Sequence, residues 1–172
     1  MKKSLFIIIG ILIIVFIVSF IVKNLNSVEI GEFKYFKFSY STGYAMNSSV
    51  SYAVRLEGNK YYATIKLDGV SEEDAVIVEV DDNTIDKIIN VLKKYHVEKW
   101  NGFNKSNKHV MDGNSFSLTV RMKNDDYISA TGYMMWPKNY SNVKSELDNI
   151  FKIVLRKKNN LFLSYKYLDF II

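Results

Sequence analysis

The 172-residue sequence contains no cysteine, one proline and two histidines. The absence of cysteine excludes disulfide bonds, thiolate nucleophiles and zinc–sulfur sites, as well as a lipid anchor attached through cysteine. A domain formed by this chain is therefore held together by its hydrophobic core. Neither His96 nor His109 lies in a nucleophile motif or at the spacing of metal ligands, so the sequence gives little support to catalysis.

A cluster of basic residues is also missing from the main part of the chain. The formal net charge is +5, but residues 24–155 carry 16 basic and 17 acidic residues. The basic excess lies near the two ends of the sequence. Because a nucleic-acid surface needs a concentrated positive charge, we expect no nucleic-acid partner. A composition of 48% hydrophobic, 24% charged and 15% aromatic residues is typical of a globular domain.

One long apolar run stands at the N-terminus, over residues 5–22, with lysines on both sides. Eighteen residues in a helix cover about 27 Å, which is close to the hydrocarbon thickness of a bilayer, about 30 Å. The run predicts a transmembrane anchor over residues 1–23 that makes the membrane a partner. A cleavable signal peptide is the alternative, but it requires small residues before the cleavage site, and these are missing.

The distribution of lysines around the run predicts its orientation and the order of domains. More positive charge precedes the run than follows it, which places the N-terminus in the cytoplasm and the remainder outside, at the cell membrane. We then expect a polar connector over residues 24–32, an extracytoplasmic domain over 33–155 and a basic, aromatic tail over 156–172. The tail fits an edge strand, a segment lying on a membrane surface, or an extension beyond the domain.

Alternation of apolar and polar residues predicts several strands. Residues 33–40 alternate, with Tyr35, Lys37 and Ser39 on the polar side. Residues 50–67 predict a hairpin that turns at Gly58-Asn59. A two-residue loop pairs residues so that every apolar side chain lies on one face, and the predicted pairs are Glu57 with Lys60, Leu56 with Tyr61, Val54 with Ala63, and Tyr52 with Ile65.

Two segments show the 3.6-residue spacing of amphipathic helices. The first follows possible N-cap residues at 81–84, and its apolar residues are Ile85, Ile88, Ile89 and Leu92. The second begins near residues 137–141, and its apolar residues are Val143, Leu147, Ile150, Phe151 and Val154. After the transmembrane helix, we therefore predict an α+β domain in which an antiparallel sheet is covered on one face by two helices.

The two halves of the domain resemble each other. Residues 49–55 align with residues 115–121, and each half ends in an amphipathic helix. This similarity fits two ββα repeats or the general likeness of amphipathic hairpins. In the second hairpin, a two-residue loop would place Ile128 and Ala130 on the polar face. We therefore predict a three-residue loop at residues 124–126, which pairs Met122 with Ile128 and Val120 with Ala130.

Several turn motifs lie close together between Trp100 and Tyr140. They are Trp-Asn-Gly-Phe at 100–103, Asp-Gly-Asn-Ser-Phe-Ser-Leu at 112–118, and Gly-Tyr-Met-Met-Trp-Pro-Lys-Asn-Tyr at 132–140. Together they resemble a family of uncharacterised secreted or membrane-anchored proteins of gut and clostridial Firmicutes, many of them lipoproteins. The resemblance covers roughly residues 95–151, and this chain differs by lacking the lipoprotein cysteine. It implies a location and a fold, and it implies no catalytic residue.

Carboxylates also occur in groups, at residues 72–74 and 81–82. Calcium loops alternate acidic residues and place a glutamate after them, and neither group has this spacing. Turns exposed to solvent account for both groups. Turns and a helix start account for Gly102 and Pro137, and packing at the edge of the sheet accounts for Trp100 and Trp136. We expect no metal and no cofactor.

The polar face of the predicted sheet is the remaining candidate site. It gathers tyrosines, basic residues and hydroxyl groups, and the residues we select as candidates for binding are Arg55, Tyr62, Lys66, Arg121 and Tyr127. Such a face can bind a peptide, a glycan or a protein through aromatic area and hydrogen bonds, or it can simply be solvated. We expect a non-catalytic, membrane-anchored binding or interaction domain; the alternatives are a small cell-envelope hydrolase and an accessory subunit of a membrane complex.

Overall fold

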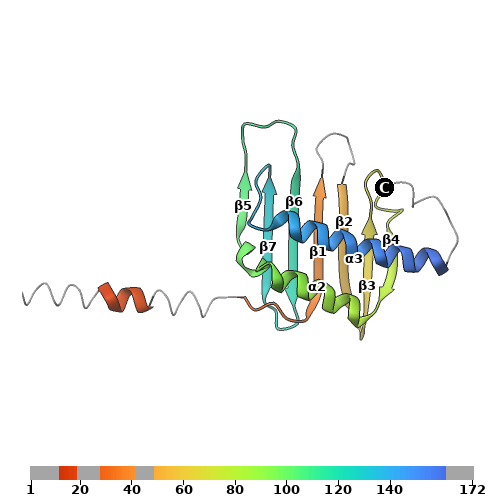
Figure 1. Ribbon diagram of the computed structural model, residues 1–172, viewed down its shortest axis with the longest axis horizontal. Coiled ribbons are helices and arrows are strands. Elements are labelled where there is room, and N and C mark those ends of the chain that lie inside the picture. Colours follow the sequence, from red (N-terminus) through yellow and green to blue (C-terminus); the bar gives the residue numbers. More distant parts are fainter. Residues whose placement is uncertain (1–11, 19–27, 42–48, 162–172) are drawn as a thin grey trace, which may run out of the picture.

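The computed structural model describes residues 12–18, 28–41 and 49–161. After a helix over residues 12–18, the elements in chain order are β1 (Phe33–Ser41), β2 (Ser49–Glu57), β3 (Lys60–Lys66), β4 (Val76–Val80), α2 (Asp82–Lys94), the 3₁₀ helix η1 (Val97–Trp100), β5 (Phe103–Ser106), β6 (Ser115–Met122), β7 (Tyr127–Tyr133) and α3 (Tyr140–Leu161). The predicted α+β class is confirmed. The strands form one layer, and α2 and α3 cross the same face of it (Figure 1).

The seven strands form one sheet in the order β4-β3-β2-β1-β6-β7-β5. The prediction of a purely antiparallel sheet is wrong, because β5 pairs with β7 in parallel, with Phe103 opposite Ala130. This strand escaped prediction because it has four residues, of which only Phe103 is apolar, and so shows no alternation. The connection from β5 to β6 passes β7, which lies between them in the sheet.

The predicted transmembrane helix is a second error in the expected fold class. Within the predicted span, the structure describes residues 12–18, which are helical and whose side chains are 49–73% exposed. Seven helical residues cover only about 10 Å. Among the described residues, no helix is long and apolar enough to cross a membrane. The other residues predicted to lie in the span, 5–11 and 19–22, fall outside the described part of the chain, as do residues 24–27 of the connector.

The first hairpin is confirmed pair by pair. Strands β2 and β3 place Glu57 opposite Lys60, Leu56 opposite Tyr61, Val54 opposite Ala63 and Tyr52 opposite Ile65. Gly58 adopts a φ of 58° in the turn, a conformation that glycine enters without a steric penalty. Agreement between the turn residues and the apolar alternation fixes this register.

The register predicted for the second hairpin is wrong by two residues. Val120 lies opposite Ile128 rather than Ala130, and Arg121 lies opposite Tyr127. The loop keeps the expected three residues but lies one position earlier, at residues 123–125, because the Met122 backbone N–H donates to the Asp126 carbonyl at 2.8 Å. The Asn124 side chain also accepts from the Asp126 backbone N–H, at 3.1 Å. A shift of two residues keeps every side chain on its predicted face, so the alternation alone could not detect it.

Both amphipathic helices are confirmed, and they form the core with one face of the sheet. The predicted apolar residues of α2 and α3 are all buried, and Leu147 and Phe151 are fully buried. The Asp81 side chain caps α2 by accepting the Thr84 backbone N–H at 2.9 Å. Helix α3 continues to Leu161, beyond the predicted end of the domain; residues 162–172 of the predicted tail lie outside the described part.

The two similar segments found in the sequence lie on opposite sides of the central strand β1. Ser41 faces Ser49 on one side and Ser115 on the other. At the far end of β1, Tyr35 lies between Arg55 and Arg121 in the same way. The edges of the two halves differ, because β4 is antiparallel to β3 whereas β5 is parallel to β7. The similarity in sequence therefore corresponds to a spatial equivalence about β1.

Candidate functional site

The sheet face turned away from α2 and α3, which we call the open face, carries a line of alternating tyrosine and arginine side chains. The pairs in register are Tyr62 with Arg55, Arg55 with Tyr35, Tyr35 with Arg121, and Arg121 with Tyr127. We call these five residues the Tyr/Arg row. It crosses five neighbouring strands at right angles to the chain direction. Side chains in register on neighbouring strands lie about 5 Å apart, close enough to contact one another.

The structure thus brings together four of the five residues selected from the sequence, and it adds one. Arg55, Tyr62, Arg121 and Tyr127 lie in the Tyr/Arg row, whereas Tyr35 at its centre was not selected. The alternation in residues 33–40 had placed Tyr35 on the polar face. The missing information was the position of β1 between β2 and β6, which no local pattern in the sequence reveals.

The side chains of the Tyr/Arg row are accessible to solvent to different degrees. Tyr35 and Tyr62 are half-buried, Tyr127 is 43% exposed, and both arginines are exposed. The Arg55 Nε lies 2.6 Å from Glu57 Oε1 in an ion pair along the same strand. Among the ion pairs of the described residues, none includes Arg121. Arg121 therefore has free hydrogen-bonding capacity for a ligand.

A lysine and a set of hydroxyl groups adjoin the Tyr/Arg row. Lys37, two residues beyond Tyr35 on β1, is exposed and lies between Ala53 and Thr119. Beyond it, three strands contribute serines, and their hydroxyls pair across β1 and β6, with Ser39 Oγ 2.8 Å from Ser117 Oγ and Ser41 Oγ 2.7 Å from Ser115 Oγ. These residues line a hollow of about 240 Å³ at that end of the open face.

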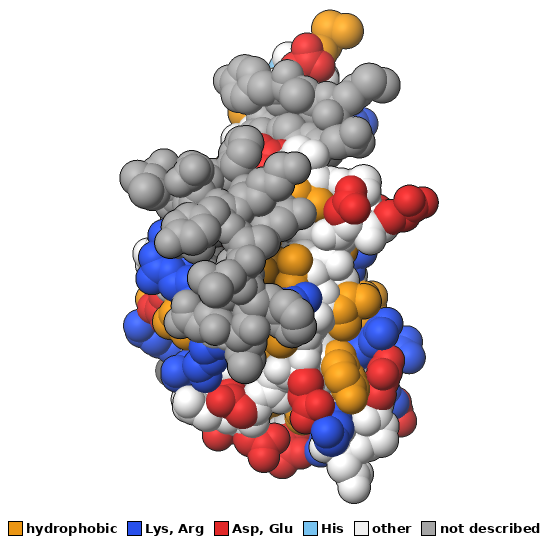
Figure 2. All heavy atoms as spheres, turned by 90° about the vertical axis from the view of Figure 1, so that its right-hand side faces the viewer, with side chains coloured by type: hydrophobic (Ala, Val, Ile, Leu, Met, Phe, Trp, Pro, Cys, Tyr) orange, Lys and Arg blue, Asp and Glu red, His pale blue; other side chains and the backbone are white. Residues whose placement is uncertain are grey.

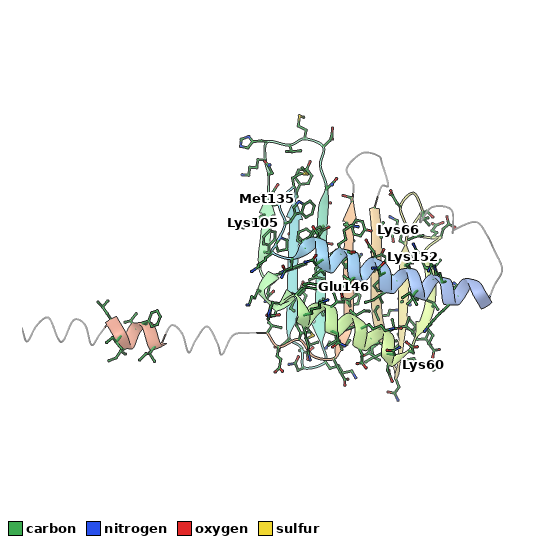
Figure 3. The ribbon with its side chains drawn as sticks, viewed as in Figure 1. Lys60, Lys66, Lys105, Met135, Glu146 and Lys152 are labelled. Carbon is green, nitrogen blue, oxygen red and sulfur yellow. The ribbon has the colours of Figure 1, made fainter. Side chains whose placement is uncertain are left out.

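Lys66, the fifth selected residue, does not join the Tyr/Arg row. It lies four residues from Tyr62 along β3, a distance of about 13 Å, and only 8% of it is exposed. Its Nζ donates to Ser49 Oγ at 2.9 Å and lies 3.4 Å from the Glu72 carboxylate. Figure 3 shows Lys66 near the end of β3. Its ammonium group is thus engaged within the protein.

The open face is basic even though the domain is nearly neutral. Its strands carry five basic residues on this face, Lys37, Arg55, Lys60, Lys66 and Arg121, and two acidic residues, Glu57 and Glu79. Basic and acidic side chains instead lie side by side on the flank that carries β4 (Figure 2). The local charge of the open face therefore favours an anionic ligand.

A larger hollow, of about 440 Å³, lies between the first hairpin and the start of α2. Its charged lining residues are Glu32, Asp82, Asp86 and Lys123. The Lys123 ammonium donates to the Glu32 carboxylate at 2.5 Å, and this hydrogen bond lowers the pKa of Glu32 below its usual value. An exposed ion pair accounts for these two groups without a ligand.

A hydrogen-bonded group that sequence reasoning missed lies under α3, on the side of the sheet that the helices cover. The Asp148 carboxylate accepts from the hydroxyls of Tyr40 and Tyr52, at 2.9 Å each, and from the Lys144 ammonium at 2.7 Å. Burial is the main cause that raises the pKa of both tyrosines well above the usual value. Both therefore stay neutral at physiological pH, as hydrogen-bond donors that join the sheet to α3.

The two histidines lie in separate parts of the described structure. His96 precedes η1 and lies 3.2 Å from the Glu98 carboxylate, whereas His109 is exposed in the loop before β6. Asp112 lies in that same loop, and Arg121 lies near the opposite end of β6, roughly 20 Å away along the strand. In the part of the chain that the structure describes, no group of three or more histidine, aspartate or glutamate residues could hold a metal ion.

The turn motifs between Trp100 and Tyr140 pack at the β5 end of the sheet. Trp100 is 2% exposed, and its Nε1 donates to the Lys138 carbonyl at 3.0 Å. Trp136 is partly exposed and stacks on Tyr140, with 4.5 Å between the ring centroids. These contacts account for the aromatic residues of the motifs by packing.

No protein-family model matches this chain, and no curated protein is similar enough in sequence to count as a match. The resemblance to secreted and membrane-anchored Firmicutes proteins therefore stays a prediction.

Proposed function

We propose that this protein is a non-catalytic binding domain that holds an extended, negatively charged ligand on the open face of its sheet. The observation that carries the proposal is the Tyr/Arg row, in which three tyrosines and two arginines from five strands form one continuous line. The five residues of the row are spread between positions 35 and 127 of the chain. A sheet face needs polar residues to stay soluble, but it does not need tyrosine and arginine to alternate in one line.

The chemistry of the two residue types supports this proposal. Tyrosine gives a rigid apolar ring and a hydroxyl at a small entropic cost, and arginine gives a planar set of donors that matches carboxylates and phosphates. Both are enriched among the residues that dominate binding energy at interfaces. Their alternation also places each arginine in register between two tyrosines of neighbouring strands, so a ligand lying across the row can reach an aromatic ring and a guanidinium together.

The alternatives drawn from the sequence gain no support from the site. A hydrolase needs a nucleophile or an activated water next to a base, and His109 and Asp112 lie far from Arg121. An accessory role in a membrane complex stays a prediction, as does a location outside the cytoplasm. Protease treatment of intact cells tests the location, since an exposed domain would be digested and a cytoplasmic one would be protected.

A thermal-shift experiment on the full chain tests the proposed function. We expect at least one anionic polymer, from a panel of polyglutamate, acidic polysaccharides and polyphosphate, to raise the melting temperature of the wild-type protein. The double variant Arg55→Ala/Arg121→Ala should lose this shift. The matched control is Lys87→Gln/Lys93→Gln, which removes two exposed positive charges from α2, on the opposite side of the molecule.

Two results would contradict the proposal. The first is a folded protein that no member of the panel stabilises. The second is equal loss of stabilisation in the control and in the double variant, since that result would indicate attraction by net charge alone rather than binding at the open face.

A further inference from the structure

The spacing of the Tyr/Arg row restricts the kind of ligand that fits it. Neighbouring strands of a sheet lie about 4.8 Å apart. One strand separates Tyr62 from Tyr35, and one strand separates Tyr35 from Tyr127. The backbones of the tyrosines therefore repeat about every 9.6 Å, twice the strand spacing. Arg55 and Arg121 are separated in the same way and lie between the tyrosines. A ligand that crosses the strands meets an aromatic ring and a guanidinium in turn.

An extended peptide does not match this period. Its side chains return to the same side every second residue, about 6.7 Å apart. A peptide would also gain most from hydrogen bonds to a free strand edge, whereas the Tyr/Arg row crosses the middle of the sheet. Two linked hexose rings of a linear polysaccharide, in contrast, have a length similar to the repeat of the row.

The alternation of chemistry along the row adds a second restriction. The flat apolar side of a sugar ring packs on an aromatic ring, and a carboxylate accepts two parallel hydrogen bonds from a guanidinium. One arginine therefore corresponds to one carboxylate on every second sugar. Of the two arginines in the row, Arg55 is held by Glu57 at 2.6 Å, whereas no ion pair among the described residues includes Arg121.

The positions next to the row suit the hydroxyl groups of sugars. The next row on the same face, two residues away from the Tyr/Arg row, contains Lys37, Thr64, Thr119 and Ser129. All four side chains can donate hydrogen bonds, directly or through water. Two acidic residues lie beside the row, Glu57 on β2 and Glu79 opposite Tyr62 on β4, and each is paired with a basic residue, Arg55 at 2.6 Å and Lys60 at 2.9 Å. These ion pairs reduce the repulsion that an anionic chain meets.

We infer that the Tyr/Arg row binds an alternating acidic glycan, a linear polysaccharide in which a uronic acid alternates with a neutral sugar. Its chain runs across the strands, its rings lie on the tyrosines and its carboxylates face the arginines. This inference rests on the proposed function and names the ligand class for the same site.

Titration calorimetry with the full chain tests this inference. The probes are three oligosaccharides of equal length: an alternating glucuronate–N-acetylglucosamine chain, a polygalacturonate with a carboxylate on every ring, and a neutral chito-oligosaccharide. We expect the alternating chain to bind at least about tenfold more tightly than either of the other two, because it alone matches both the charge and the period of the row.

Variants of the central residue separate ring contact from charge. Tyr35→Ala should weaken binding of the alternating chain about tenfold, whereas Tyr35→Phe, which keeps the ring, should bind as the wild type does. Arg121→Gln should cause a loss at least as large, and the control Lys87→Gln/Lys93→Gln should cause none. Circular dichroism of each variant verifies that the domain is folded.

Each remaining outcome decides between the two proposals. Equal affinity for the alternating chain and polygalacturonate overturns the inference, as does unchanged binding by Tyr35→Ala. If the wild type instead binds polyglutamate or polyphosphate, and the row variants lose that binding, the proposed function stands and the alternating glycan is wrong. If it binds the neutral glycan as tightly as the alternating chain, the negative charge of the ligand is wrong and both proposals fail. If the row variants alter binding to none of these probes, both proposals fail.

Discussion

The two faces of the seven-stranded sheet are built from the same strands and meet opposite environments. On β1, Phe36 and Phe38 are fully buried under the helices, while Tyr35 and Lys37, which alternate with them, lie on the open face. Phe36 stacks on Phe151 of α3, and Tyr35 lies between two arginines. Because the side-chain period of a strand is two, one residue of sequence separates the core from the candidate site.

This contrast implies that stability and binding belong to different side chains of the same strands. The covered face gathers the large apolar residues, which contribute most of the free energy of folding through burial. The open face gathers tyrosines, arginines and hydroxyls, which contribute less to folding when solvent reaches them. The predictions below test this separation, beginning with the largest expected effect.

Substitution of neighbouring residues on β1 gives the sharpest contrast. Phe36→Ala should lower the free energy of unfolding by about 3–5 kcal/mol, because it opens a cavity in a fully buried position. Tyr35→Ala, one residue away, should lower it by about 1 kcal/mol or less. Urea denaturation monitored by circular dichroism measures both values. A similar loss in the two variants would show that the open face is part of the stabilising core.

The hydrogen bonds under α3 should give the next largest effect. Asp148→Ala leaves the hydroxyls of Tyr40 and Tyr52 without their acceptor on the covered side, and we expect a loss of about 2 kcal/mol in unfolding free energy. Adding Tyr40→Phe and Tyr52→Phe to this variant removes the unsatisfied donors and should recover part of the loss. No recovery would mean that the packing of Asp148 matters more than its hydrogen bonds.

The cap of α2 should contribute less, with a defined pH dependence. Asp81→Ala should cost about 1 kcal/mol, because the Thr84 backbone N–H loses its acceptor. Hydrogen bonds from Thr84 lower the pKa of Asp81 in the folded state. Its stabilising effect is therefore complete above the unfolded value of about 3.9 and is lost as the pH falls through the lower folded pKa.

Denaturation curves of Asp81→Ala and the wild type at several pH values measure this dependence. The difference between the two proteins should shrink as the pH falls below about 4. The variant Asp81→Asn keeps an acceptor without the charge and should show no such change. A difference that stays constant down to pH 2 or so, well below the usual aspartate value, would exclude ionised Asp81 as the capping group.

Parts of the candidate site that depend on local patterns could be predicted from the sequence. Arg55 and Tyr62 were placed opposite each other because the Gly58-Asn59 turn and the apolar alternation favour one register. The pair Arg121 and Tyr127 was placed on the right face but in the wrong register. There, a shift by two residues exchanges no faces, and hydrogen bonds within the turn decide between the two registers.

Features that depend on contacts distant in sequence could not be predicted. Tyr35 reaches the centre of the Tyr/Arg row only because β1 lies between β2 and β6, an order that tertiary packing decides. Asp148 finds its tyrosine partners 96 and 108 residues away along the chain. The strand β5 is too short for a periodic signal, and its pairing with β7 is what makes the sheet mixed.

The smallest expected effect on stability is that of Arg121→Gln, which tests whether the open face contributes to folding. Arg121→Gln should change the free energy of unfolding by less than about 0.5 kcal/mol, because its exposed guanidinium has no ion pair among the described residues. The same substitution is expected to weaken ligand binding at least about tenfold. Denaturation and calorimetry on one sample measure both. A loss of stability above about 1.5 kcal/mol would show that Arg121 holds neighbouring strands together, and the Tyr/Arg row would then be a structural ladder rather than a binding surface.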